Sequence, residues 1–338
     1  MEAMRNANRR LTLRARPTGL AGPEHFAEDV AAIRSPGAGE VLLETLLLSI
    51  DPAMRVWLNA DPGYVAPIAI GEVMRAGGIA RVIESRAEGL RAGDVVQGRL
   101  GWQSHPTLAG GELEKLDTAV ATPLDWIGLL GMTGLTAYFG LHAIGRVRPA
   151  ETVLVSGAAG GVGQVVGQIA RIEACRVVGI AGGAVKCAWL TGEAGFDAAI
   201  DYKAEPDLAA AIARACPGGV DVFYDNVGGA TLDAALANLR VRGRVVICGR
   251  ISQTAAAELY GVRQLGQLIG KRARVEGFVV TDFTERFAEA RHWLMAQRDA
   301  GRLRQRVHVI DGLERAPDGL AMLFRGENKG KLVVRVAD

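Results

Sequence analysis

A glycine turn between an apolar segment and a helical segment constrains the fold more than any other part of this sequence. Residues 153–167 read VLVSGAAGGVGQVVG, which predicts a buried strand, a turn and the start of a helix. Gly157, Gly160 and Gly163 recur every three residues, and glycine lets the backbone approach a pyrophosphate closely. The helix start offers free N–H groups and the positive end of the helix dipole. This order of strand, glycines and helix predicts a dinucleotide-binding unit.

The rest of the C-terminal half alternates between strand and helix patterns, which favours a parallel sheet covered by helices. Six expected strands match a full doubly wound dinucleotide domain. They cover residues 153–156, 176–180, 198–202, 220–226, 244–249 and 274–280, and the expected helices cover 162–173, 185–194, 207–215, 230–239 and 284–300.

The first part of the chain has a different sequence pattern, which is typical of strands and turns. Residues 39–50, 75–85 and 93–102 are strand-like and broken by glycines, and little helix is expected before residue 124. The tail 304–338 is strand-like again and could return to this β-rich part. A length of 338 residues agrees with two domains.

The end of the second strand, about 20 positions past the glycines, decides between NAD and NADP. NAD enzymes place Asp or Glu there to bind the ribose 2′-hydroxyl, but this chain has Ala181, Gly182 and Gly183. Lys186 follows, and a lysine attracts the 2′-phosphate that a carboxylate would repel. The sequence therefore favours NADP(H) as cofactor.

Composition narrows the class of partner. Lys and Arg number 39 against 37 Asp and Glu, which indicates neither nucleic acid nor a membrane surface as partner. Residues 1–10 lack the apolar core of a signal peptide, and no apolar run approaches the ~18 residues of a membrane span. Four cysteines without CxxC spacing favour a cytoplasmic protein. No cysteine precedes Cys175 and no two histidines lie four apart, so we expect no metal site.

Eight further motifs carry a family resemblance that extends over about residues 9–336. The chain resembles the zinc-independent medium-chain dehydrogenase/reductases, and within them the prostaglandin reductase and alkenal double-bond reductase group. The resemblance implies an α/β protein with a GroES-like, β-rich substrate domain (residues 1–123 with 301–338) and a doubly wound Rossmann NADP-binding domain (124–300). The motifs are LSIDPAMR (48–55), GEVMRAGG (71–78), GMTGLTAYFGL (131–141), GFDAAIDYK (195–203), FYDNVGG (223–229), ICGRISQ (247–253), EGFVVTD (276–282) and GENKGK (326–331).

The resemblance also implies where the cofactor binds. The pyrophosphate would lie against the glycine turn, the 2′-phosphate against a lysine and a tyrosine, and the nicotinamide against several backbone segments. In that order the residues are Gly160, Gly161, Val162 and Gly163; Lys186 and Tyr202; Asn226, Met132 and Thr133, then Cys248, Gly249, Arg250, Ile251, Ser252, Thr254, Phe278, Val279 and Val280, with Asn328 closing the cleft.

Without a Lewis acid, alcohol oxidation is disfavoured, whereas hydride delivery to an already electrophilic carbon stays feasible. We therefore expect NADPH-dependent reduction of the C=C bond of α,β-unsaturated aldehydes or ketones, with hydride added to the β-carbon. A quinone reductase, or a protein that binds NADPH without turnover, remains an alternative. No residue stands out as donor of the α-proton. Tyr64 is a weak candidate for that role, and a surface tyrosine is at least as compatible with the sequence.

Two expectations concern the substrate site and assembly. Several aromatic residues common in the family are replaced here, by Ala53, His105, Thr254 and Gly270, which favours a wider or differently shaped substrate site.

The last expected Rossmann strand, 274–280, is apolar and would leave an exposed sheet edge in a monomer. The family commonly pairs this edge with its copy, so we expect a homodimer.

Overall fold

The computed structural model describes residues 7–63, 65–256 and 258–337, and these form two compact units. Unit 1 comprises the residues up to Ile127, Val307–Asn328 and the residues from Leu332 onward. Unit 2 comprises Gly128–Arg306 and Lys329–Lys331. No helix within the described ranges is both long enough and apolar enough to span a membrane.

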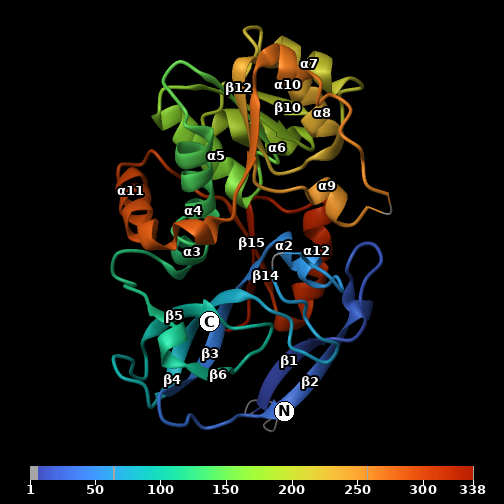
Figure 1. Cartoon of the computed structure of the whole chain (residues 1–338). Coiled ribbons are helices and arrows are strands. Elements are labelled where there is room, and N and C mark those ends of the chain that lie inside the picture. The colour runs from blue at the N-terminus through green and yellow to red at the C-terminus, as the bar shows by residue number, and fades with distance from the viewer. Residues whose placement is uncertain (1–6, 64, 257, 338) are drawn as a thin grey trace. The chain divides into compact units, whose positions relative to one another are not determined.

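Unit 2 is built on a six-stranded parallel sheet with the order β10-β9-β8-β11-β12-β13. Figure 1 labels two of its strands, β10 and β12. This is the doubly wound order in which the first and fourth strands lie side by side at the centre. The strands are β8 (Thr152–Ser156), β9 (Arg176–Ala181), β10 (Ala198–Asp201), β11 (Val220–Asp225), β12 (Leu239–Ile247) and β13 (Arg274–Gly277).

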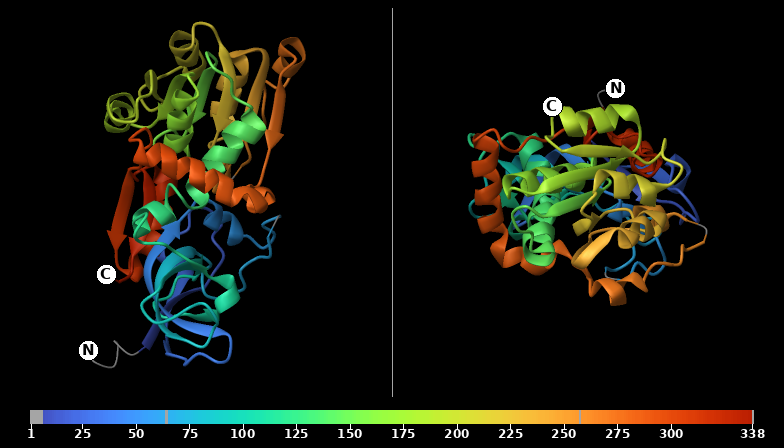
Figure 2. Two further views of the ribbon diagram at one scale, coloured as in Figure 1. Left: turned by 90° about the vertical axis from the view of Figure 1, so that its left-hand side faces the viewer. Right: turned by 90° about the horizontal axis from the view of Figure 1, so that it is seen from above.

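Helices cover both faces of this sheet (Figure 2). Apolar residues of β11 and β12 pack with α7 and α8 in one core cluster, which includes Phe223, Val245 and Ile212. The helices of unit 2 are α4 (Met132–Phe139), η3 (Gly140–Gly145), α5 (Gly161–Ile172), α6 (Ala184–Gly192), α7 (Leu208–Ala215), α8 (Gly229–Ala237), α9 (Ile251–Thr254), α10 (Gln267–Lys271), η4 (Val280–Arg286) and α11 (Phe287–Asp299).

Unit 1 is β-rich. Its main sheet has the order β14-β15-β3-β4-β5-β7, with β6 paired to β3, and β1 and β2 form a separate antiparallel pair. Leu48, Met54 and Trp102 are fully buried in its core. Its strands are β1 (Ala7–Leu13), β2 (Phe26–Ala32), β3 (Glu40–Ile50), β4 (Gly77–Ser85), β5 (Val95–Arg99), β6 (Thr107–Ala109), β7 (Glu114–Lys115), β14 (Val307–Asp311) and β15 (Lys331–Arg335), and its helices are η1 (Pro23–His25), α2 (Ala53–Trp57), η2 (Gly110–Glu112), α3 (Pro123–Ile127), η5 (Leu313–Arg315) and α12 (Ala316–Arg325).

The structure confirms the predicted α/β class and the doubly wound topology, and it corrects several element bounds. The tail is only partly strand, because α12 occupies ten residues between β14 and β15. Pro317 in its first turn and Gly326 in the left-handed conformation at its end are ordinary helix boundaries. Strand β13 ends at Gly277, because the chain enters η4 at Val280.

Candidate functional site

The glycine turn lies where β8 and β11 are neighbours, the point at which the strand order reverses. Doubly wound proteins bind ligands at this switch point, beyond the carboxyl ends of the strands. A Cβ on Gly163 would lie 2.4 Å from the carbonyl oxygen of Gly157, so this close turn excludes a side chain. Helix α5 starts at Gly161, directly after the turn, and the first N–H groups of a helix have no partner within the helix.

Asn226 lies directly beside this turn. Its side-chain Nδ2 donates a 2.7 Å hydrogen bond to the carbonyl of Ser156, and its backbone N–H donates to Ser156 Oγ at 2.8 Å. The carboxylate of Asp225 accepts hydrogen bonds from Ser156 Oγ and from the N–H groups of Val227 and Gly228. The turn that follows β11 is therefore held rigidly at the switch point.

The segment after β12 packs on the same turn. The N–H groups of Cys248 and Gly249 donate to the carbonyl of Asp225, at 2.9 and 3.1 Å. Ile251 N–H donates to the carbonyl of Asn226 at 3.3 Å. Ser252 donates to the carbonyl of Val227 through its N–H and its Oγ, at 3.1 and 2.6 Å. Arg250 is also adjacent, because its Cβ lies 3.2 Å from a Cβ placed on Gly228. Thr254 is half-buried, and its Oγ1 donates a 3.1 Å hydrogen bond to the carbonyl of Arg250.

The residues expected around the nicotinamide are partly assembled in unit 2. Thr133 is buried, with its methyl group 3.0 Å from a Cβ placed on Gly161, while the neighbouring Met132 is exposed. Phe278 packs against Gly140, where an added Cβ would lie 2.7 Å from its ring. Val279 is exposed and Val280 half-buried.

The two remaining expected site residues are Asn328 and Tyr64, and their roles stay predictions. Asn328 is buried in unit 1, in the turn between α12 and β15, and so lies outside the unit that holds the glycine turn. Tyr64 falls outside the described residues.

No residue at the end of β9 itself is acidic, and lysine side chains and one carboxylate of β10 lie nearby. A Cβ placed on Gly182 would lie 2.9 Å from the ring of Tyr202 and 3.0 Å from Cε of Lys203, so both side chains cover this glycine. The nearby carboxylate of Asp201 accepts the N–H groups of Gly183 and Lys203. Burial, and then the positive charges of Lys203 and Arg306, lower the pKa of Lys186. An anion at this place would relieve that repulsion.

Thiol and phenol groups at the switch point are neutral at pH 7. Burial raises the pKa of the Cys248 thiol to about 12 and the pKa of Tyr224 well above its ordinary value. Tyr224 donates a 2.9 Å hydrogen bond to the carbonyl of Thr136. Neither group is a ready nucleophile or base. Within residues 7–63, 65–256 and 258–337, no three His, Cys, Asp or Glu side chains form a group that could hold a metal ion.

These features together fit NADP(H). The glycine turn packs too tightly for a Cβ at Gly163, and the first N–H groups of α5 lie beside it, where a pyrophosphate can accept hydrogen bonds. Lys186 and Tyr202 flank the acid-free end of β9, where a 2′-phosphate is needed for NADP(H) and a carboxylate for NAD. Sequence reasoning missed Ser156, Asp225 and Gln164, which are buried polar residues next to apolar runs.

Comparisons with known proteins agree with this geometry. A model of the N-terminal domain of oxidoreductases matches residues 9–116, and a zinc-binding dehydrogenase model matches residues 161–296. The NADPH-dependent curcumin reductase of Escherichia coli is 40% identical, covering 100% of this chain and 99% of its own. The 2-alkenal reductase (NADP⁺-dependent) of Nicotiana tabacum is 40% identical over 89% of this chain and 88% of its own.

A solved structure shows the same fold. The crystal structure of CurA from Vibrio vulnificus in complex with NADPH superposes with a TM-score of 0.93 at 36% identity, covering 98% of this chain and 99% of CurA. The likeness extends over both units, so the predicted combination of a GroES-like and a Rossmann domain is confirmed. The chain belongs to the medium-chain dehydrogenase/reductase family, in the group of the alkenal double-bond and prostaglandin reductases.

Proposed function

We propose that this protein reduces the C=C bond of α,β-unsaturated aldehydes or ketones with NADPH. The observation that carries the proposal is the near-full-length likeness to a curcumin reductase and a 2-alkenal reductase, since a 2-alkenal is an α,β-unsaturated aldehyde. The end of β9 has no acidic residue of its own and has Lys186 and Lys203 nearby, which supports NADPH as the cofactor. Residues 124–300 would form the NADP-binding domain, and residues 1–123 with 301–338 the substrate domain.

The cofactor, when bound, supplies the hydride that the β-carbon accepts. The chain's own part is to bind and orient. The N–H groups at the start of α5 would bind the pyrophosphate, and Lys186 and Tyr202 the 2′-phosphate. The hydrogen-bonded turn at Asn226 and the backbone of Cys248–Thr254 would border the nicotinamide, with Thr133 beneath it. Each reduced double bond takes up one hydride and one proton, and we assign the α-proton to solvent.

An isotope experiment tests this reaction. With NADPH deuterated at the transferred position and an enone in ordinary water, we expect deuterium only at the β-carbon, and no effect of chelators on the rate. Deuterium at the carbonyl carbon, giving an allylic alcohol, would show a carbonyl reductase instead. Faster NADPH oxidation with a naphthoquinone than with simple enones would favour the quinone reductase. Tight NADPH binding with no NADPH oxidation across a broad panel of acceptors would show that the protein binds NADPH without catalysing a reaction.

The sheet edge supports a homodimer. Strand β13 is the last strand of its sheet and pairs with β12, so its other edge has no partner strand among the described residues. Val275 and Val279 are exposed along this segment, at 38% and 42% of their full area. Pairing with a second copy would cover this edge. Light scattering at micromolar concentration should give twice the mass of 35.7 kDa, and a monomer there would contradict the proposal.

The state of the cysteines supports a cytoplasmic location. Cys175, Cys187, Cys216 and Cys248 are all free thiols, and two of them are buried. Free thiols persist where glutathione and thioredoxin keep them reduced. Fractionation of cells that make the protein should recover it with cytoplasmic markers, and recovery with an oxidising compartment would contradict the proposal.

A further inference from the structure

The backbone of Arg306 is fixed beside the glycine turn. Its N–H donates to Gln164 Oε1 at 2.7 Å, and its carbonyl accepts from Gln164 Nε2 at 3.1 Å and from Lys331 N–H at 2.9 Å. Gly330, which precedes Lys331, forms a β-bridge with Gly160. A Cβ on Gly330 would lie 1.9 Å from the carbonyl oxygen of Arg306. Arg306 is therefore held close to the residues expected to bind the pyrophosphate.

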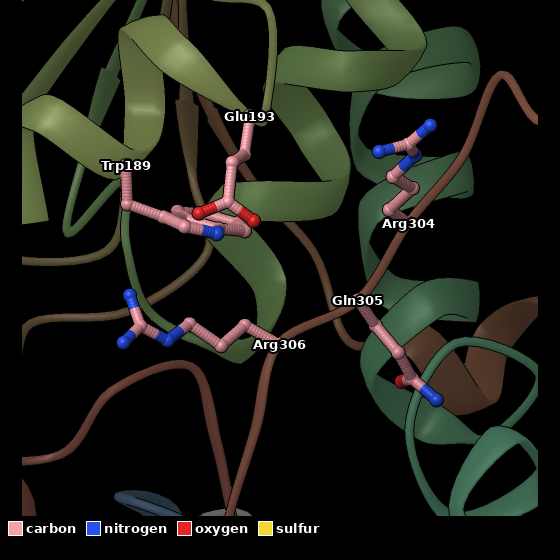
Figure 3. Close-up of a pocket in the computed structure, with 5 residues that line it drawn as sticks. All are labelled: Trp189, Glu193, Arg304, Gln305 and Arg306. Carbon is pink, nitrogen blue, oxygen red and sulfur yellow. The ribbon is translucent and has the colours of Figure 1, made fainter.

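The side chain of Arg306 reaches α6. Its guanidinium carbon lies 5.8 Å from the centroid of the Trp189 ring, and both residues line a cavity of about 310 Å³ (Figure 3). Trp189 follows Lys186 by three residues on α6, so the two share a face of the helix. Glu193 also lines this cavity, and its side chain points toward the indole of Trp189 in Figure 3. Within the described part of the chain, Arg306 forms no salt bridge with a carboxylate.

Arg306 therefore adds a charge to the site already described. Its guanidinium lies over Trp189, which is one helical turn from Lys186 on α6. Burial, and then the positive charges of Lys203 and Arg306, lower the pKa of Lys186. Positive charges brought close together repel one another, and a bound anion would lower that repulsion. A phosphate carries close to two negative charges at neutral pH and accepts hydrogen bonds on three oxygens. A guanidinium presents a planar pair of donors that matches phosphate oxygens.

We propose that Arg306 is a further specificity-determining residue for NADPH, whose guanidinium binds the 2′-phosphate together with Lys186. The inference rests on the proposed cofactor site. Stacking on Trp189 limits the rotamers of the guanidinium before the cofactor arrives, so less entropy is lost on binding. The clamp by Gln164 and Lys331 fixes the point from which the side chain extends.

Arg304 provides a matched control. Its N–H donates to Gln168 Oε1 and its carbonyl accepts from Gln168 Nε2, both at 2.8 Å. The backbone of Arg306 forms the same pair of hydrogen bonds with Gln164, which lies one helical turn earlier on α5. Its side chain is exposed and points away from Trp189 (Figure 3). A variant of Arg304 removes the same charge from the same segment without touching the proposed contact.

Calorimetry on the full-length, cofactor-free protein tests the proposal, with 2′,5′-ADP and 5′-AMP as probes. Arg306→Met keeps the aliphatic packing and removes the charge. We expect it to weaken 2′,5′-ADP binding about tenfold and to leave 5′-AMP binding within about twofold of the wild type. Arg306→Lys should recover part of the loss, and Arg304→Met should change neither probe. Unchanged 2′,5′-ADP binding, or equal losses for both probes, would overturn the assignment.

The Lys186→Ala variant distinguishes two results: that Arg306 does not bind the 2′-phosphate, and that the proposed 2′-phosphate site is itself wrong. If Lys186→Ala weakens 2′,5′-ADP binding and Arg306→Met does not, Arg306 is no ligand and the proposed site stands. If neither variant changes it, the 2′-phosphate site itself is wrong. The unfolding temperature of each cofactor-free variant shows whether the packing on Trp189 is intact. An Arg306→Met protein that unfolds as the wild type does and has lost only 2′,5′-ADP affinity would support direct contact.

Discussion

Ser156 and Asp225 form a buried pair at the ends of the two central strands of unit 2. Ser156 Oγ donates a 2.7 Å hydrogen bond to Asp225 Oδ1 and accepts the N–H of Asn226 at 2.8 Å. The same carboxylate oxygen accepts the N–H groups of Val227 and Gly228, at 2.9 and 3.0 Å. One buried oxygen thus fixes the turn that carries Asn226 to the proposed cofactor site.

The first prediction concerns this acceptor. Burial raises the pKa of Asp225, so the negative charge is unfavourable there, whereas an oxygen acceptor is needed. Asp225→Asn keeps an oxygen and should hold NADPH affinity within about threefold of the wild type. Asp225→Ala leaves buried N–H groups unpaired and should lower the free energy of unfolding by about 1–3 kcal/mol and NADPH affinity about tenfold. Urea unfolding and NADPH titration measure both effects, and equal losses for the two variants would refute the acceptor role.

The second prediction concerns cofactor selection by Lys186. A charge-assisted contact to phosphate is worth about 1.5–3 kcal/mol, so Lys186→Ala should weaken NADPH binding by roughly ten- to a hundredfold. NADH lacks the 2′-phosphate, and its affinity should stay nearly the same. Fluorescence titration with each cofactor measures the ratio. Equal losses for NADPH and NADH would remove Lys186 from the 2′-phosphate site.

The topology of unit 2 could be predicted because its signals are local. The glycine turn, the apolar runs of β8 and β11, and the motif at Asn226 each lie within a few residues of one another in the sequence. Their meeting at the switch point follows from the doubly wound strand order. The structure confirms that order and brings Asn226, Cys248 and Ser252 together through backbone hydrogen bonds.

Other features depend on contacts between distant parts of the chain. The proximity of Arg306 to Trp189 joins positions 117 residues apart, and no local pattern encodes it. The role of Asp225 was missed because a carboxylate at the end of an apolar strand is usually exposed to solvent. Here the carboxylate is buried and accepts hydrogen bonds from backbone N–H groups. Helix α12 did carry local signals, in Pro317 and Gly326, but the strand-like residues on either side of it dominated the pattern.

The third prediction concerns the pH dependence of thiol modification. Burial raises the pKa of Cys248 to about 12 and those of Cys175 and Cys216 to about 11, so below pH 10 each is almost entirely the unreactive thiol. The alkylation rates of these three should rise about tenfold per pH unit from pH 7 to 9, because the thiolate fraction does so below the pKa. Cys187 and Cys248 are both half-buried, but the pKa of Cys248 is raised to about 12, so Cys187 should react first. Peptide mass mapping with iodoacetamide measures the order, and early, pH-independent labelling of Cys248 would contradict the assignment.

The last prediction compares two glycines in neighbouring helices. A Cβ on Gly163 would lie 2.4 Å from the carbonyl oxygen of Gly157 and 2.8 Å from Cα of Ala158, and backbone atoms cannot move aside as a side chain can. Gly163→Ala should lower the free energy of unfolding by about 1–3 kcal/mol and weaken NADPH binding, because the turn must open. Gly192 ends α6 with nothing within 4 Å of an added Cβ. Gly192→Ala should be neutral or stabilise by about 0.4–1 kcal/mol, since it restricts the unfolded chain. Urea unfolding with and without NADPH distinguishes them. A Gly163→Ala protein as stable as Gly192→Ala, with unchanged NADPH affinity, would show that the turn does not need its close approach to bind the cofactor.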